Sequence, residues 1–311
     1  MQANESLPYQ DFSNSLFDDF NSYISGAVSL IFNAILIVAT IKIKTYTRPV
    51  KFSMCTLSVL RMMFSISIGL TVPSIIYSKS VSTLYIVKNG YSFPIPLGNA
   101  LLAIFVAFIV MSCNLPAVQY LQVASLLSSS SRKELNWTIS LIPIIIVIPV
   151  LFLLFFGYIP PPNGVHVSSQ ILGKIAEQGP ASYLIITIRM HLDHGDETIR
   201  FETFSQICTA FVLLVILISL IVVIICYFYI RKQMKVRFSV SSISKKAQEQ
   251  LNMVLALQFI LPFTTINIPF FIIVILPFFG LAARVLADQA LWFFSWCPAI
   301  NPILMIVMVK V

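Results

Sequence analysis

Seven apolar segments, each long enough to cross a lipid bilayer, divide this chain of 311 residues. A helix needs about 20 predominantly apolar residues to span the hydrocarbon core. The segments cover residues 22–43, 52–77, 97–127, 138–159, 205–230, 249–278 and 285–309. Inside a membrane every backbone polar group must be satisfied within the protein, so such segments form helices. The sequence therefore predicts an all-α membrane protein, one domain over residues 1–311 folded as a bundle of seven transmembrane helices.

The composition excludes other broad classes of protein. Residues of hydrophobic type make up 58% of the chain and charged residues only 10%, whereas about a quarter of an ordinary soluble domain is charged. The net charge of +8 does not indicate nucleic-acid binding, because the basic residues lie between the apolar segments. We find no catalytic motif and no cofactor motif, so the sequence does not favour an enzyme.

The distribution of basic residues predicts the orientation of the bundle. The loops that would face the cytoplasm hold twelve Lys and Arg residues and those that would face outside hold six. Cytoplasmic loops of membrane proteins carry such an excess, so we expect an extracellular N-terminus and a cytoplasmic C-terminus. Residues 1–21 then form an extracellular segment, 160–204 a long extracellular loop, and 231–248 a basic cytoplasmic loop. Asn4 begins a glycosylation sequon on the outer side, which supports this topology weakly.

No metal site is expected. The long outer loop contains His191, Asp193, His194 and Asp196, but their spacing matches no zinc motif, and a solvated loop is the favoured interpretation. The five cysteines show no C-x-x-C spacing and are interpreted mostly as small buried hydrophobic residues.

Prolines within the last two spans predict two kinked helices. A proline removes one helical hydrogen bond and frees the carbonyl four residues earlier, which in lipid must find a donor elsewhere. Pro262 frees the carbonyl of Gln258, and Pro302 frees that of Pro298, with Asn301 at the same turn. Two interpretations stay open: kinks that only serve packing, or a bundle whose two helices pivot at five hinge residues, Gln258, Pro262, Pro298, Asn301 and Pro302.

Arg61 lies about ten residues from the inner end of the second span. A central arginine costs about 2.5–3.5 kcal/mol to insert, so it should face the bundle interior or a wet cavity. No acidic residue lies at matching depth in another span. We therefore expect backbone carbonyls or amides as its partners, or a side chain that reaches toward the inner surface.

Three stretches of sequence resemble the nematode serpentine chemoreceptors of the Str superfamily, especially its Srd-like branch, which are divergent G-protein-coupled receptors. They are "FNAILIVATIKIKTYTRPVKFSM", "QEQLNMVLALQFILPF" and "PAINPILMIVMVK". The Asn301-Pro302 pair is similar to that of G-protein-coupled receptors in general, but Met305 stands where their common pattern has Tyr. The acidic-Arg-Tyr motif of the third helix is absent, and residues 161–207 lack the cysteine that pairs with the third helix in ordinary receptors.

The resemblance implies a multi-pass receptor of the plasma membrane, in sensory cilia, that detects a small environmental chemical in olfaction. It further implies signalling through a heterotrimeric G protein. Relatives continue into a cytoplasmic tail beyond the seventh helix, and whether the end at Val311 reflects a shortened product is left open. Assembly as a homo- or heterodimer is left open.

The expected mechanism assigns residues to two regions of the bundle. A small apolar ligand would enter the outer half, with candidate contacts at Asn99, Phe105, Phe211, Phe270, Phe271 and Trp292. A G protein or anionic lipid would meet the inner surface at Arg231, Lys232, Lys235, Arg237, Lys245 and Lys246, although topology alone also explains these charges. The alternative is a ligand-gated channel subunit or a small-molecule carrier.

Overall fold

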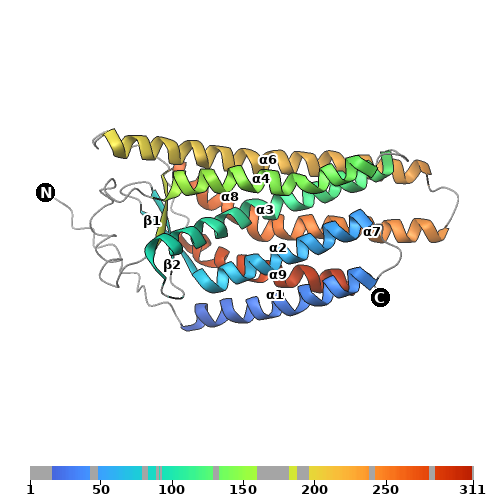
Figure 1. The fold of residues 1–311 in the computed structure, drawn as a ribbon, viewed down its shortest axis with the longest axis horizontal. Coiled ribbons are helices and arrows are strands. Elements are labelled where there is room, and N and C mark those ends of the chain that lie inside the picture. Colours follow the sequence, from blue (N-terminus) through green and yellow to red (C-terminus); the bar gives the residue numbers. More distant parts are fainter. Residues whose placement is uncertain are drawn as a thin grey trace.

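The computed structural model describes residues 16–42, 48–78, 83–88, 91, 93–128, 133–159, 182–187, 196–237, 242–279 and 284–309. Long helices run side by side along one axis as a bundle (Figure 1). They are α1 (Leu16–Lys42), α2 (Arg48–Thr71), α3 (Ile95–Ser128), α4 (Lys133–Tyr158), α6 (Asp196–Arg237), α7 (Ser242–Pro262) with its continuations η1 (Phe263–Asn267), α8 (Ile268–Ile275) and η2 (Leu276–Phe279), and α9 (Arg284–Val309).

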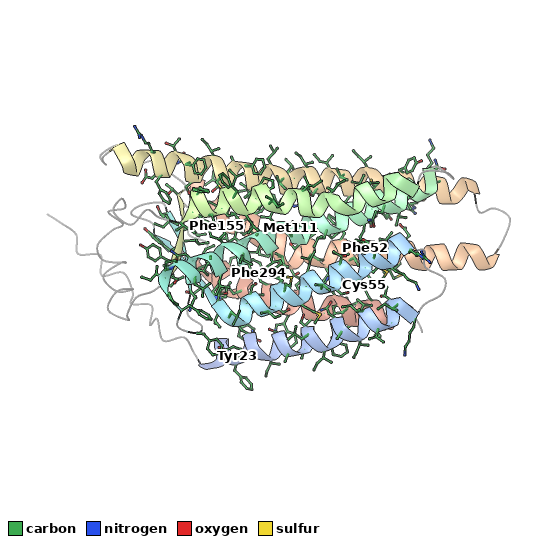
Figure 2. All side chains as sticks on the ribbon, in the orientation of Figure 1. Tyr23, Phe52, Cys55, Met111, Phe155 and Phe294 are labelled. Carbon is green, nitrogen blue, oxygen red and sulfur yellow. The ribbon has the colours of Figure 1, made fainter. Side chains whose placement is uncertain are left out.

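The lengths and composition of these helices fit a bilayer. Among the described residues, six helices are long and apolar enough to cross a membrane, and α4 contributes a shorter apolar stretch, Ile148–Tyr158. The helices on the outside of the bundle turn apolar side chains away from it: Tyr23 is 41% exposed, whereas Met111 and Phe294 in the interior are almost completely buried (Figure 2). Together these features confirm the predicted helical membrane bundle.

α3 is the central helix of the bundle. It packs against α2, α4, α6 and α7, and most of its apolar span is buried. Phe105 and Ile109 of α3 belong to the main hydrophobic cluster, together with Phe64 of α2 and Phe294 of α9. Burial on all sides explains why α3 is apolar around its whole circumference, as expected for a fully enclosed helix.

A three-stranded antiparallel sheet lies at one end of the bundle (Figure 1). Its strands are β1 (Pro73–Ser78), β2 (Thr83–Lys88) and β3 (Tyr183–Thr187), in the order β1-β2-β3. The expectation that the second span continues to residue 77 is therefore corrected. The helix stops because Val72 adopts a positive φ of 36° and Pro73 has no N–H to continue the helical bonding. The apolar residues that follow pair with β2, for example Ile75 with Ile86.

The sheet is fastened to the helices through side chains. Asn99 of α3 accepts a hydrogen bond from the backbone N–H of Tyr183 at 2.9 Å. At the other end of β3, Ser205 of α6 accepts one from the N–H of Thr187 at 3.1 Å. These bonds place β3 over the ends of α3 and α6, so that the sheet covers this end of the bundle.

Several helices extend beyond the predicted spans. The predicted loop at 160–204 contains β3 and the first turns of α6, and most of the predicted loop at 231–248 is helix, because α6 continues to Arg237 and α7 begins at Ser242. α1 likewise begins at Leu16, within the segment predicted as 1–21. A search for long apolar segments detects only the part of a helix that lies within lipid. Lys, Arg, Gln and Glu are good helix formers that continue a helix into water.

Gly157 permits a close approach between α4 and α6 and provides a test of the packing. A Cβ at this position would lie 2.8 Å from Cys208 Cβ, closer than real carbon atoms approach. We expect Gly157→Ala to lower the free energy of unfolding by about 1–3 kcal/mol, because the two helices must move apart. Gly69→Ala is the matched control, since its Cβ would meet Tyr23 Cδ1 at an ordinary 3.9 Å and should leave stability unchanged or higher.

Thermal unfolding of the purified variants measures both effects. Cys208→Gly in the Gly157→Ala background should recover part of the loss, because it removes the atoms that the new methyl group meets. If Gly157→Ala and Gly69→Ala unfold at the same midpoint temperature, α4 and α6 are not in this close contact.

Candidate functional site

The sixth span changes its helical winding directly after Pro262. Residues Phe263–Asn267 form a single π-helical turn, η1, between α7 and α8. Such turns arise where the regular hydrogen bonding is interrupted, and they are frequent at functional sites. The predicted kink is thus a local widening of the helix, and the sequence reasoning did not anticipate its π form.

Polar side chains within the turn donate hydrogen bonds to backbone carbonyls of the preceding helical turn. The hydroxyl of Thr264 donates to Ile260 O at 2.8 Å, and that of Thr265 donates to Leu261 O at 2.7 Å. Asn267, which is completely buried, donates to Pro262 O at 3.1 Å. The run Thr264-Thr265-Ile266-Asn267 after a proline is the sequence signal for this turn, because each of these polar side chains reaches back one helical turn.

A second compensated carbonyl lies in α9. Pro302 leaves Pro298 O without its helical donor, and Asn33 of α1 supplies one, at 3.0 Å from Nδ2 to the oxygen. Asn33 also donates to Ser29 O at 2.9 Å, and Ser29 accepts from Ser65 of α2 at 2.7 Å. The freed carbonyl thus finds its partner on a neighbouring helix, as expected in lipid. α9 remains one continuous helix, and a polar network joins it to α1 and α2.

Met305, in the last turns of α9, contacts side chains of two other helices. Its thioether sulfur accepts a hydrogen bond from Gln258 Nε2 of α7 and lies 3.8 Å from a guanidinium nitrogen of Arg61. A thioether is a weak acceptor, so neither donor gains a strong bond there. Met305, which stands where the common pattern has Tyr, therefore lies where α9 meets Arg61 of α2 and Gln258 of α7.

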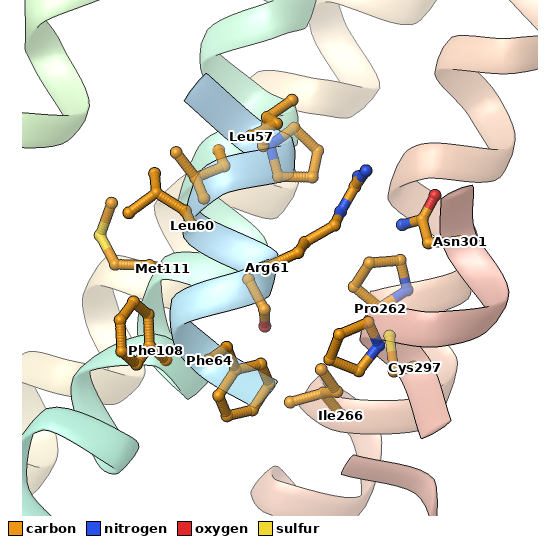
Figure 3. A pocket seen from close by; sticks show the side chains of 14 residues that line it. Leu57, Leu60, Arg61, Phe64, Phe108, Met111, Pro262, Ile266, Cys297 and Asn301 are labelled. Carbon is orange, nitrogen blue, oxygen red and sulfur yellow. The ribbon is translucent and has the colours of Figure 1, made fainter. Parts of the chain in front are cut away.

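A cavity lies between α2 and α3 on one side and α7, η1 and α9 on the other (Figure 3). The space between its lining atoms measures about 430 Å³, including the part open to its surroundings. Apolar side chains of α2 and α3, such as Leu57 and Phe108, form one wall. The opposite wall contains Pro262, Pro298 and Asn301. A proline of α7 and a proline of α9 therefore border the same cavity, which sequence reasoning about each helix alone could not reveal.

Arg61 extends into this cavity from α2 (Figure 3). Met305 Sδ is the hydrogen-bond acceptor of its guanidinium group among the described residues. The sequence predicts a backbone carbonyl or an amide as the partner of Arg61. Among the described residues the partner is instead the thioether of Met305. The expectation that Arg61 faces an interior cavity agrees with its place in the lining.

Two further polar side chains border the cavity. Asn301 is 2% exposed, and its Nδ2 has no hydrogen-bond partner among the described residues. Ser112 of α3 donates to Ile109 O at 2.6 Å and receives a bond from Asn267 Nδ2 at 3.3 Å, which couples the π turn to α3. The cavity thus presents a charged donor, an unpartnered amide donor and a hydroxyl on an otherwise apolar lining.

The six residues predicted to contact a ligand do not line this cavity. Phe105 and Phe270 lie in the main hydrophobic cluster, and Phe271 packs against it. Asn99 is buried where α3 holds β3. Phe211 and Trp292 are 37% and 40% exposed, on the outside of the bundle. Their role in binding a ligand stays a prediction.

The basic residues predicted to face a G protein lie at the end of the bundle opposite the sheet. Arg231 and Lys232 are exposed near the end of α6. Lys235 and Arg237 lie in the last turns of α6, and Lys245 and Lys246 in the first turns of α7. The sequon at Asn4 and the loop residues His191, Asp193 and His194 fall outside the described residues.

Comparisons with known proteins give one family and one fold. The family model described as "Serpentine type 7TM GPCR chemoreceptor Str" matches residues 18–311. The fold is similar to that in the crystal structure of squid rhodopsin, with a TM-score of 0.62 and 15% sequence identity. The superposition covers 94% of this chain and 81% of the rhodopsin chain. At that identity the likeness shows the fold alone. No curated protein matches the chain.

Proposed function

Because the chain belongs to the Str family of serpentine seven-transmembrane chemoreceptors, we propose that it detects a small environmental chemical and signals through a heterotrimeric G protein. The observation that carries the mechanism is that Pro262 and Pro298 line one cavity. Any change in that cavity acts on both kinked helices at once. We place the receptor in the plasma membrane of sensory cilia, with the sheet end of the bundle outside the cell.

For the ligand we propose the outer half of the bundle, between the sheet and the cavity. Phe105 and Phe270 already pack in one cluster there, and Phe271 lies beside them. A small apolar molecule among these rings would press directly on α8, because Phe270 and Phe271 belong to that helix. Asn99 offers a polar group at the edge next to the sheet. Phe211 and Trp292 would form the wall that faces lipid.

The proposed signal is a movement of α7 relative to α6. A ligand shifts a conformational equilibrium only by the difference in its affinity for the two states. If the ligand favours a state in which α8 is displaced, the π turn at Phe263–Asn267 is the place where the displacement is converted into a new direction of α7. The inner ends of α6 and α7 then separate, and Arg231 and Lys232 would meet the G protein.

A calcium-readout panel of small volatile and water-soluble compounds tests this function. The chain is expressed in cells with and without a promiscuous Gα subunit, and the same compounds are applied to both. We expect at least one compound to evoke calcium only in the cells that contain the Gα subunit. A ligand-evoked current in cells without G-protein signalling, together with an N-terminal tag found inside intact cells, would replace this proposal with the channel alternative.

A further inference from the structure

Among the side chains that the structure describes, none supplies a negative charge beside Arg61. Glu202 is the one acidic residue in the candidate membrane spans, and it lies near the sheet end of α6. Arg61 lies in the middle of α2, where its guanidinium contacts the thioether of Met305. A guanidinium group stays charged in proteins and carries five N–H donors, so one weak acceptor leaves most of its capacity unused.

A donor without an acceptor lies on the opposite wall of the same cavity. The buried side-chain atoms without a hydrogen-bond partner in the described part of the chain are Asn33 Oδ1, Gln119 Oε1, Asn252 Oδ1 and Asn301 Nδ2. Asn301 Nδ2 is the donor among them, and Asn301 lines the cavity together with Arg61. Figure 3 shows the Arg61 and Asn301 side chains extending into the space between α2 and α9. Buried donors normally have partners, so this pair calls for an acceptor from outside the chain.

We propose that this cavity binds a small anion, either chloride or the carboxylate of a short organic acid, held between the Arg61 guanidinium and Asn301 Nδ2. An anion is the ligand that supplies both acceptors and also balances the charge of Arg61. A metal cation would be repelled by the guanidinium group, and the apolar lining, with Leu57 and Phe108, offers it no carboxylate. Such bonds to an ionised acceptor are about twice as strong as neutral ones.

The anion would bridge α2 and α9 directly beside both kinks. Pro262 and Pro298 border the cavity, so the state of the kinked helices determines the shape of the site. Occupancy then favours the arrangement in which Arg61 and Asn301 face each other. This site is separate from the ligand region proposed in the outer half of the bundle, and anion binding does not depend on any G protein.

Thermal unfolding of the purified full-length chain in lipid nanodiscs tests the proposal. Sodium chloride is titrated against sodium gluconate at constant ionic strength, so that general screening does not change. A parallel series replaces chloride by acetate and separates the two sources of anion. We expect the unfolding midpoint to rise with chloride, acetate or both, because a ligand that binds only the folded state stabilises it. Equal midpoints in chloride, acetate and gluconate would overturn the proposal.

Two variants assign the effect to the cavity. Arg61→Gln should weaken the apparent affinity at least about tenfold, and in gluconate it should unfold no earlier than the parent chain, because an uncompensated buried charge is gone. Asn301→Asp should raise the midpoint in gluconate and remove the anion dependence, because its carboxylate takes the place of the anion. Lys42→Gln, which removes an exposed charge at the end of α1, is the matched control and should respond like the parent.

The variants also keep the test decisive if one of them fails to fold. If Arg61→Gln yields no folded protein, Asn301→Asp alone decides, since the proposal requires it to abolish the anion response. An anion response that survives in either variant at parental strength would overturn the proposal, because the anion would then bind elsewhere. A negative compound panel with an intact anion response would instead refute the signalling function and leave this site standing.

Discussion

Replacing Asn33 by alanine is expected to lower the free energy of unfolding by about 1–2 kcal/mol and to reduce the amount of receptor at the cell surface. The variant removes the donor that reaches Pro298 O at 3.0 Å from α1. Pro302 has no N–H, so the carbonyl would be left unsatisfied inside the bundle. A buried acceptor without a partner costs about 1–3 kcal/mol, and interhelical hydrogen bonds in membranes contribute up to about 2 kcal/mol.

A double-mutant cycle with Pro302→Ala separates this cause from general loss of packing. Alanine at 302 has an N–H that can bond to Pro298 O along the helix, so the carbonyl no longer needs Asn33. We therefore expect Asn33→Ala to cost clearly less in the Pro302→Ala background than in the parent chain. Thermal unfolding of the four purified proteins gives the coupling energy directly. If the two losses simply add, Asn33 does not serve the proline-freed carbonyl.

Pro262→Ala is expected to reduce the ligand-evoked response about fivefold or more at unchanged surface expression. The alanine N–H can bond to the carbonyl of Gln258 and favours an ordinary α-helix through the π turn. Asn267 then loses its bond to Pro262 O, because that bond spans five residues and depends on the π spacing. A coupling free energy of about 1–3 kcal/mol corresponds to changes of about 5- to 150-fold, so a modest preference for the straightened helix has a large effect on signalling.

The response is measured with an active compound from the calcium panel, alongside surface labelling of each variant. Ile260→Ala is the matched control, because Ile260 lies on α7 close to Pro262 and its side chain is 51% exposed on the outside of the bundle. It should signal within about twofold of the parent. Loss of surface expression in Pro262→Ala with a normal response per receptor would indicate that the kink serves packing alone.

The sequence is sufficient for those features that depend on one helix and on the lipid around it. Apolar length predicts the helices, and the missing N–H of Pro302 predicts a freed carbonyl that needs a donor from another helix. Arg61 in a span without a carboxylate predicts a side chain that faces an internal cavity. Each of these inferences needs only the local rule and no knowledge of which helices are neighbours.

Other features require contacts between distant segments. β1 follows α2 inside one continuous apolar run, and its pairing with β2 and β3 cannot be read from hydropathy alone. The identity of Asn33 as the donor to Pro298 depends on α1 lying beside α9. The cavity combines residues from α2, α3, α7, η1 and α9, so the joint placement of Arg61 and Asn301 appears only in three dimensions.

The predicted ligand contacts illustrate the same limit. Aromatic residues in the outer half of a span are equally suited to a core, a cavity wall or a lipid-facing surface. Phe270 is buried and Trp292 is 40% exposed, although the sequence presents both as aromatic residues near the outer end of a helix. Only the packing of neighbouring helices distinguishes these positions.

The central claim is that α7 moves away from α6 at their inner ends when the receptor signals. Spin labels at positions 232 and 253 report this distance, since Lys232 and Met253 are exposed where α6 and α7 leave the membrane span. Cys55, which is half-buried, is replaced by serine to prevent stray labelling. The distance is measured in nanodiscs before and after addition of the active compound and a nucleotide-free heterotrimeric G protein. The mechanism predicts a widening of more than about 2 Å. An unchanged distance in a sample that binds the G protein would contradict it.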